Sequence, residues 1–216
     1  MKCIILIAAP AAGKGTISKY IEDKYNYKHI STGDLLRKEI KNNTNIGKRI
    51  KSILDKGSLV GDDIIKEVFE KEFKKTKSNI ILDGIPRTLA QAKMLDMLDE
   101  NNDNIEIDKV IHIDIDKDIA VERIENRLIC ENCGSVFSKK LINNNICTKC
   151  GDSLISRNDD NKETFLDRYD TFIKETKPLL NYYKDKVITI YNNGTLDDIY
   201  KDVDSIIKGD DNSDNN

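Results

Sequence analysis

The chain has 216 residues, 34% of them charged, and its 35 basic and 38 acidic side chains leave a net charge of only −3. This balance excludes a polybasic nucleic-acid or membrane binder, and 38% hydrophobic residues exclude a chain that is disordered throughout. No apolar run approaches the ~18 residues of a membrane span. Five cysteines, four of them in two close pairs, fit metal binding in a reducing compartment better than a disulfide framework, so we expect a cytoplasmic protein.

Strand-like apolar runs alternate with helical patterns along the chain. The first apolar run leads into a glycine-containing loop, not a cleavage region, and so predicts a buried strand instead of a signal peptide. In chain order, we expect a strand at 2–9, helices at 15–25, 31–40 and 64–73, a strand at 79–82, a helix at 89–98, a strand at 110–115, helices at 119–128 and 163–183, a strand at 187–191 and a helix at 196–207. Pro178 should bend or interrupt the long helix. This alternation is typical of an α/β protein with a parallel sheet flanked by helices.

Two segments depart from the alternation. Residues 130–151 are Asn-rich, carry the paired cysteines and read as an insertion into the α/β core. The polar, acidic tail at 209–216 is expected to be disordered.

The first predicted strand ends in a loop of small residues that opens a helix, which is the context of a phosphate-binding loop. Backbone N–H groups in such a loop, together with the helix N-terminus, bind anions, and Lys14 would add a positive charge for the β- and γ-phosphates. The strict G-x-x-x-x-G-K-[ST] pattern is broken twice, by Ala8 and by Gly15. The loop alone therefore leaves open a plain turn between strand and helix.

Several motifs in order resemble the adenylate kinase family, in its long-lid form, over nearly the whole chain. They are Gly-Lys-Gly-Thr at 13–16, Ser-Thr-Gly-Asp-Leu-Leu-Arg at 31–37, and Leu-Asp-Gly-Ile-Pro-Arg-Thr at 82–88 followed by Gln91. The match continues with Arg123, Arg127, Arg-Asn-Asp-Asp at 157–160, Arg168 and Asn-Gly-Thr at 193–195. Each motif is weak alone, and the ordered set is specific.

The resemblance implies a P-loop nucleoside-monophosphate kinase fold with a five-stranded parallel sheet. It implies a core of 1–30, 61–127 and 161–216, an AMP-binding region at 31–60 and a lid at 128–160. The implied reaction is reversible, Mg²⁺-dependent phosphoryl transfer from ATP to AMP, giving two ADP. The implied protein is a monomer with nucleotide partners and with no nucleic-acid or membrane partner.

The resemblance also assigns roles by position. ATP would be bound by Ala11, Ala12, Gly13, Lys14, Gly15, Thr16, Arg123 and Arg127. AMP would be bound by Thr32, Arg37, Val60, Gly84, Ile85, Arg87, Gln91, Arg157 and Arg168, with Gln91 reading the adenine edge. Catalysis would fall to Lys14, Arg87, Arg123, Arg157 and Arg168. Asp83 would hold the water shell of magnesium.

The scarcity of arginine supports this assignment from the residues alone. Only seven of the 35 basic residues are Arg, and all but Arg49 fall on motif positions. A planar guanidinium binds phosphate bidentately, which Lys cannot reproduce. Transfer to an ionised phosphate needs in-line positioning and dispersed positive charge but no general base, so we expect His29 and His112 to be structural.

Two alanines and an isoleucine depart from the family pattern. Ala8 and Ala11 replace loop glycines, and we expect both at ordinary negative φ with room for a methyl group. On that expectation, changing both to glycine would slightly lower the melting temperature. Ile85 replaces the usual Phe before Pro86, which removes a stacking surface near AMP.

The cysteines form two Cys-x-x-Cys pairs, Cys130 with Cys133 and Cys147 with Cys150, separated by 13 residues. Four thiolates at this spacing indicate a closed, structural Zn²⁺ site, and a glycine after each pair suits a tight turn. Reduced thiols or a redox pair are the rivals. Cys3 is expected to be a small buried hydrophobe.

Two other functions stay open. Zinc ribbons occur in nucleic-acid binders, but the insertion carries few basic or aromatic residues. A nucleoside-monophosphate kinase for another base is the second alternative, and Gln91 with the long lid favours AMP by family analogy.

Overall fold

A five-stranded, all-parallel sheet forms the centre of the protein in this computed structural model, which describes residues 1–56, 58–100 and 105–209. The strands are β1 (Lys2–Ala8), β2 (Lys28–Ser31), β3 (Ile80–Asp83), β4 (Glu106–Asp114) and β8 (Val187–Tyr191). They lie in the order β2-β3-β1-β4-β8, with β1 paired to both β3 and β4. Six of the seven residues of β1 are buried, as expected of an apolar strand at the centre of a sheet that is covered on both faces.

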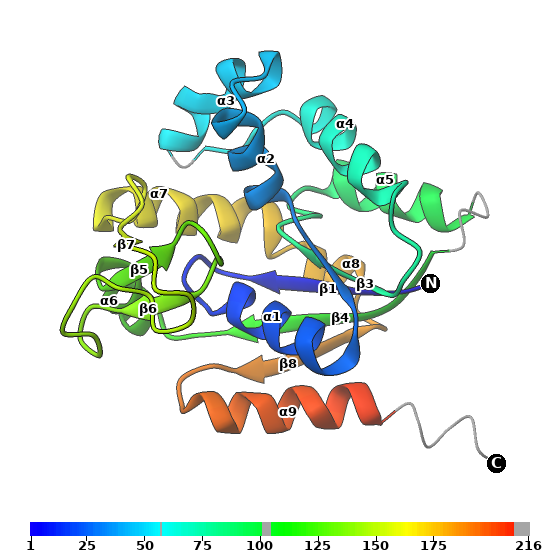
Figure 1. The fold of residues 1–216 in the computed structure, drawn as a ribbon. Helices are drawn as coiled ribbons and strands as arrows, with labels where there is room; N and C mark the ends of the chain where they lie inside the picture. The colour runs from blue at the N-terminus through cyan, green and yellow to red at the C-terminus, as the bar shows by residue number, and fades with distance from the viewer. Residues whose placement is uncertain (57, 101–104, 210–216) are drawn as a thin grey trace.

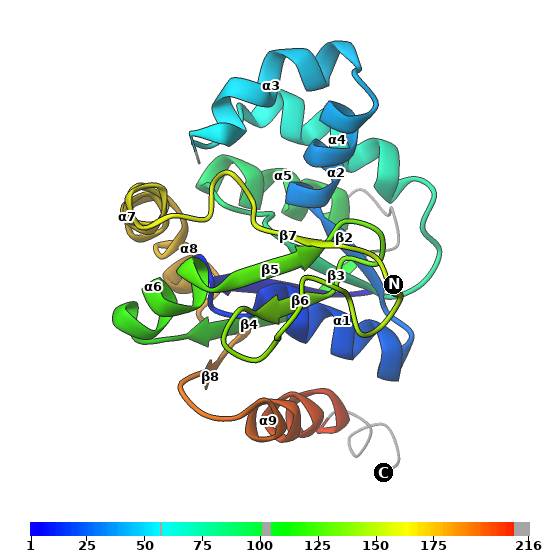
Figure 2. The same ribbon diagram turned by 60° about the vertical axis from the view of Figure 1, so that its left-hand side comes forward.

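Helices cover the sheet and extend beyond it (Figures 1 and 2). They are α1 (Lys14–Tyr25), α2 (Thr32–Lys41), α3 (Asn45–Asp55), α4 (Asp62–Phe73), α5 (Leu89–Glu100), α6 (Lys117–Glu125), α7 (Lys162–Thr171), α8 (Leu179–Tyr182) and α9 (Leu196–Lys208). The sheet arrow of β1 points toward α6 and a second, small sheet, whereas the N-terminus lies at the opposite end (Figure 1). Within the described residues, no helix combines the length and apolar character needed to span a membrane.

The small antiparallel sheet has the order β6-β5-β7 and a core of its own. Its strands are β5 (Arg127–Cys130), β6 (Val136–Ser138) and β7 (Leu154–Ile155). Its buried cluster consists of Leu128, Cys130, Cys147 and Leu154, with Phe137 and Ile142 packed against it. So small an apolar cluster buries too little surface to stabilise a sheet by itself, so we expect the cysteines to contribute to the stability of the small sheet.

The sequence missed two elements of the main body. Strand β2 is absent from the expectation because only Ile30 of its four residues is buried, which leaves no apolar run to see. Helix α3 is also missed, although Thr44 caps it by accepting a 3.0 Å hydrogen bond from the Gly47 N–H. The α/β class and the five-stranded parallel sheet are confirmed.

Two predicted helices differ from the structure. The helix expected to reach residue 128 ends at Glu125, because the chain turns at Asn126 into β5, the central strand of the small sheet. The long helix at 163–183 is interrupted as predicted: a π-helical turn (Phe172–Thr176) precedes Pro178, and α8 begins after it. The backbone N–H of Lys177 donates across this turn to the Phe172 carbonyl at 2.8 Å. Of the tail predicted to be disordered, residues 210–216 lie outside the described part of the chain.

Candidate active site

The loop between β1 and α1 contains two residues with left-handed backbone. Gly13 has φ 93°, and a side chain there would place its Cβ 2.6 Å from the Asn192 amide nitrogen. Ala11 has φ 61°, which overturns the expectation that both loop alanines sit at negative φ. Ala8 does behave as expected, because it lies inside β1 with extended backbone. A methyl group at a left-handed position is strained, so the loop carries a local cost at Ala11.

Lys14 folds back over this loop. Its Nζ donates hydrogen bonds to the carbonyl oxygens of Ala8 (2.9 Å) and Ala9 (3.2 Å). Burial lowers the pKa of Lys14 to about 8, although the charge of Asp83 opposes the shift. The nearby charges of Arg87, Arg168 and Arg127 contribute to this lowering. Three arginines from separate segments therefore lie close to Lys14: Arg87 in the loop after β3, Arg168 on α7 and Arg127 on β5.

Asp83 ends β3 and faces the same region. Its carboxylate lies 3.5 Å from His29 Nε2 on the neighbouring strand. Burial would raise the pKa of Asp83, but hydrogen bonding from His29 and the charge of Lys14 hold it below its usual range. An ionised carboxylate at this position suits Mg²⁺, a hard cation that prefers oxygen ligands and retains several waters.

A cleft with about 540 Å³ of empty space, part of it open to solvent, lies beneath α2 and α3. Seven of the residues assigned to AMP by resemblance line it: Thr32, Arg37, Val60, Gly84, Arg87, Gln91 and Arg168. Two are not in the lining. Ile85 is fully buried in the main core, and Arg157 lies toward Asp34.

Gln91 is held in one orientation within this cleft. Its amide oxygen accepts the Arg87 backbone N–H at 2.7 Å, and its amide nitrogen donates to Asp62 Oδ1 at 2.7 Å. Thr88 links α4 to α5, since its hydroxyl donates to Asp62 at the start of α4 and accepts the backbone N–H of Gln91 in α5 at 3.2 Å. The side chain is 3% exposed, so its amide is presented from a fixed, buried position.

Most of the arginines predicted to bind phosphate form ion pairs with aspartate carboxylates. Arg127 pairs bidentately with Asp160, with Nε to Oδ2 at 2.8 Å, and Arg168 Nη1 donates to Asp159 Oδ2 at 2.8 Å. Burial lowers the pKa of Arg168 to about 10, which leaves the guanidinium charged at neutral pH. The same fork geometry binds carboxylates and phosphates.

Asp34 lies between two further arginines. Its Oδ1 is 2.5 Å from Arg37 and 4.0 Å from Arg157. Burial, followed by the charges of Arg37 and Arg127, lowers the pKa of Arg157 to about 10. Five of the six motif arginines therefore form one electrostatically connected cluster.

Arg123 reaches the site by a different route. Its guanidinium donates to Asn192 Oδ1 at 3.3 Å, and Asn192 in turn donates from Nδ2 to the Ala12 carbonyl at 2.8 Å. Sequence reasoning gave Asn192 no role, and the only signal was its place next to the Asn-Gly-Thr motif.

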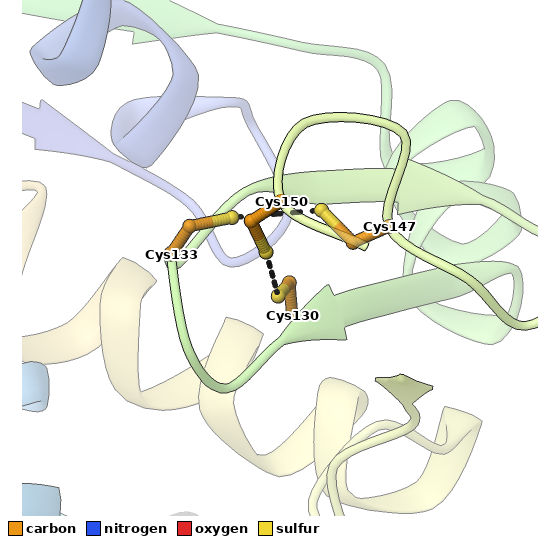
Figure 3. A group of neighbouring side chains, drawn as sticks. All are labelled: Cys130, Cys133, Cys147 and Cys150. Carbon is orange, nitrogen blue, oxygen red and sulfur yellow. Dashed lines mark hydrogen bonds between the residues drawn. The ribbon is translucent and has the colours of Figure 1, made fainter. Parts of the chain in front are cut away.

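The four insertion cysteines converge in space, with their sulfurs pointing toward one another (Figure 3). All four Sγ atoms lie within 4.8 Å of one another, and the described residues contain no other such group. The Cys130–Cys150 and Cys133–Cys147 Sγ distances are 3.4 and 3.5 Å. Tetrahedral Zn²⁺ with bonds of about 2.3 Å would separate its sulfurs by about 3.8 Å, so this donor set fits the ion closely.

The backbone around the cysteines has the same form in both pairs. Gly134 (φ 71°) donates its N–H to the Cys130 carbonyl at 2.9 Å, and Gly151 (φ 79°) donates to Cys147 at 2.8 Å. Hydrogen bonds from the Ser135 side chain and backbone lower the pKa of the exposed Cys133 thiol to about 6. The tight turns expected after each pair are confirmed.

Sequence reasoning missed the acidic side of the site. Asp34, Asp159 and Asp160 stood inside quoted motifs without a role, and Asp62 was not singled out. The two aspartates that follow Arg157 closely, in Arg-Asn-Asp-Asp at 157–160, were the available signal for two of these carboxylates.

The loop after β1 carries Lys14, and the cleft beneath α2 is lined by Arg37, Arg87 and Arg168, an arrangement that suits transfer of a phosphoryl group between two nucleotides. The fold and site together define a P-loop nucleotide phosphotransferase. Comparison with known proteins gives the family directly. The adenylate kinase family model matches residues 6–188. The chain belongs to the adenylate kinase family.

Curated relatives match over nearly their full length. The chain is 39% identical over 209 residues to the adenylate kinase of Alkaliphilus oremlandii, covering 93% of this chain and 95% of that protein. It is 37% identical over 211 residues to that of Clostridium tetani, covering 94% and 97%. It is 39% identical over 211 residues to that of Listeria monocytogenes, covering 94% and 98%.

Proposed function

We propose that this chain transfers the terminal phosphoryl group of ATP to AMP, reversibly and with Mg²⁺, giving two ADP. The observation that carries this proposal is the convergence of Lys14 with Arg87, Arg127 and Arg168, four cations from separate segments, at one place. Such convergence suits a transition state whose negative charge is spread over the transferring group.

The donor nucleotide is assigned to the phosphate loop. Backbone N–H groups at the start of α1 and the Lys14 ammonium bind the phosphates, with Thr16 at the first turn. Asp83 orients the water shell of the Mg²⁺ ion, which supplies further positive charge to the phosphates when bound. The hydrogen bond from His29 and the charge of Lys14, which lower the pKa of Asp83 against the effect of burial, keep this carboxylate ionised at neutral pH.

The acceptor is assigned to the cleft beneath α2 and α3. Arg37 and Arg87 bind its phosphate, and Gln91 meets the edge of its base. Gln91 lines the cleft, and a hydrogen bond at each end of its amide fixes which end accepts and which donates. A fixed donor and acceptor pair discriminates strongly between bases.

The arginine–carboxylate pairs serve as placeholders for phosphate. Asp159 and Asp160 satisfy Arg168 and Arg127 until nucleotide oxygens replace them, so the guanidinium groups are already oriented in the free protein. Orientation before binding removes part of the entropic cost of reaching the transition state.

The four cysteines are assigned a structural Zn²⁺ ion in a lid at 128–160. An ion held by four thiolates has no open position and does no chemistry, so its role is to hold the small sheet together. Residues 31–60 form the AMP-binding region, and the remaining segments form the core. The protein is further proposed to be a cytoplasmic monomer without nucleic-acid or membrane partners.

Initial rates with AMP, GMP, CMP and UMP as acceptors, at saturating Mg-ATP, test the proposal. We expect kcat/KM for AMP to exceed that for CMP and UMP by at least 100-fold. Gln91→Leu should lower kcat/KM for AMP by 10-fold or more, whereas Lys93→Met, on the exposed face of the same helix, should leave it unchanged. Turnover of CMP or UMP equal to that of AMP would contradict the assignment and favour a kinase for another base.

A further inference from the structure

The end of β8 buries a polar side chain where the strand pattern calls for an apolar one. Ile190 is buried, Tyr191 is exposed, and Asn192 continues the buried face at 3% exposure. Burying an amide destabilises the fold unless its hydrogen bonds to water are replaced by others within the protein. An apolar residue at this position would avoid that cost, so the partners of the Asn192 amide explain why it is there.

Both partners belong to the phosphate-binding machinery. The amide nitrogen donates to the carbonyl of Ala12 in the phosphate loop at 2.8 Å, and the amide oxygen accepts from Arg123 on α6 at 3.3 Å. The amide thus bridges two segments that are separated by more than a hundred residues along the chain. Its own backbone is fixed, because its N–H donates to the Asp114 carbonyl at the end of β4 at 2.8 Å.

The loop is shaped around this amide. A Cβ atom at Gly13 would lie 2.6 Å from Asn192 Nδ2, so glycine is required there for space as well as for its φ of 93°. Gly13 immediately precedes Lys14, and the amide therefore packs against the backbone that begins α1. A change at Asn192 alters the loop and Arg123 together.

We propose that Asn192 is a positioning residue for phosphoryl transfer, whose carboxamide ties Arg123 to the phosphate loop and so fixes this guanidinium beside the phosphates of bound ATP. This inference rests on the proposed function, in which Arg123 binds ATP. Asn192 touches neither nucleotide in this account and acts through Arg123 and Ala12. Arg123 lacks a carboxylate partner within hydrogen-bonding distance in the described part of the chain, which distinguishes it from Arg127 and Arg168.

A double-mutant cycle separates positioning from packing. Asn192→Leu removes both hydrogen bonds at similar volume, and it is measured alone and combined with Arg123→Ala. We expect Asn192→Leu to lower kcat/KM for ATP by 10-fold or more in the wild-type background and by less than 3-fold beside Arg123→Ala. KM for AMP should stay within 2-fold of wild type. Asn193→Ala is the matched control: it removes an acceptor of the Asp116 N–H in the same turn and should leave kcat/KM for ATP within 2-fold.

An equal loss in both backgrounds would overturn the proposal and assign Asn192 to packing alone, and so would no loss in the wild-type background. If Asn192→Leu does not fold, Asn192→Ala replaces it in the cycle with the same expected pattern. A wild-type protein that forms no ADP from ATP and AMP refutes the proposed function itself. Failure of the cycle in an active enzyme refutes only the role of Asn192.

Discussion

Replacing Ala11 with glycine should stabilise the protein, opposite to what the sequence suggests. Alanine at φ 61° is strained by about 1–2 kcal/mol relative to its right-handed conformation. Glycine removes that strain but makes the unfolded chain more flexible, which costs about 0.4–1 kcal/mol. The difference is a stabilisation of roughly 0 to 1.6 kcal/mol, centred at about 0.8 kcal/mol.

Scanning calorimetry measures the effect. A gain of this size raises the melting temperature of a chain of this length by about 1–4 °C. Ala8→Gly is the matched control, because Ala8 lies in β1 with ordinary backbone and its replacement should destabilise by about 0.5–1 kcal/mol. Activity should change by less than 3-fold in both variants, since the backbone N–H groups are retained. If Ala11→Gly lowers the melting temperature as much as Ala8→Gly, the reasoning from the left-handed backbone is refuted.

Three further predictions concern the lysine, an arginine and the cysteines. Lys14→Met should remove most activity without lowering the melting temperature. Because burial lowers the pKa of Lys14 to about 8 and only its charged form binds phosphate, kcat/KM for ATP should fall as the pH rises through 8. A profile that stays flat to about pH 9.5 would contradict this role of Lys14. Arg87→Lys should lower kcat/KM for AMP by about 100-fold, because the point charge of lysine cannot replace a guanidinium whose Nε donates to the Gly84 carbonyl at 3.0 Å. Full activity of this variant would argue against phosphate binding by Arg87. Chelation or Cys147→Ser should remove one zinc per chain and lower the melting temperature while residual activity remains. The control Cys3→Ala should retain the zinc. Metal analysis that finds no zinc in reduced protein would refute the structural zinc site.

The sheet was predictable where its strands carry apolar runs: β1, β3 and β4 are largely buried, and β8 keeps a β-branched run although it is mostly exposed. The expected strand at 187–191 coincides with β8, and the run at 2–9 is one residue longer than β1. Strand β2 was not predicted because it lies at the sheet edge and two of its four residues, Lys28 and His29, are polar, which leaves no apolar run. The small sheet has strands of two to four residues, too short for any periodicity to show.

The candidate site was predictable in its cations and not in their partners. Ordered motifs located the arginines, but the pairing of Arg127 with Asp160 joins residues 33 positions apart and depends on how the chain folds back. The backbone at Ala11 could not be foreseen either, because alanine rarely adopts left-handed φ. Asn192 became visible only when the end of β8 was placed against the phosphate loop.

In the proposed reaction, ATP gives a single phosphoryl group and AMP receives it. Phosphorus NMR of the purified protein with equimolar Mg-ATP and AMP measures this directly. We expect two ADP to form for each ATP and AMP consumed, the reverse reaction to proceed from ADP alone, and no ADP to form from ATP without AMP. Release of inorganic phosphate from ATP in place of ADP formation from AMP, or the absence of any ADP, would contradict it.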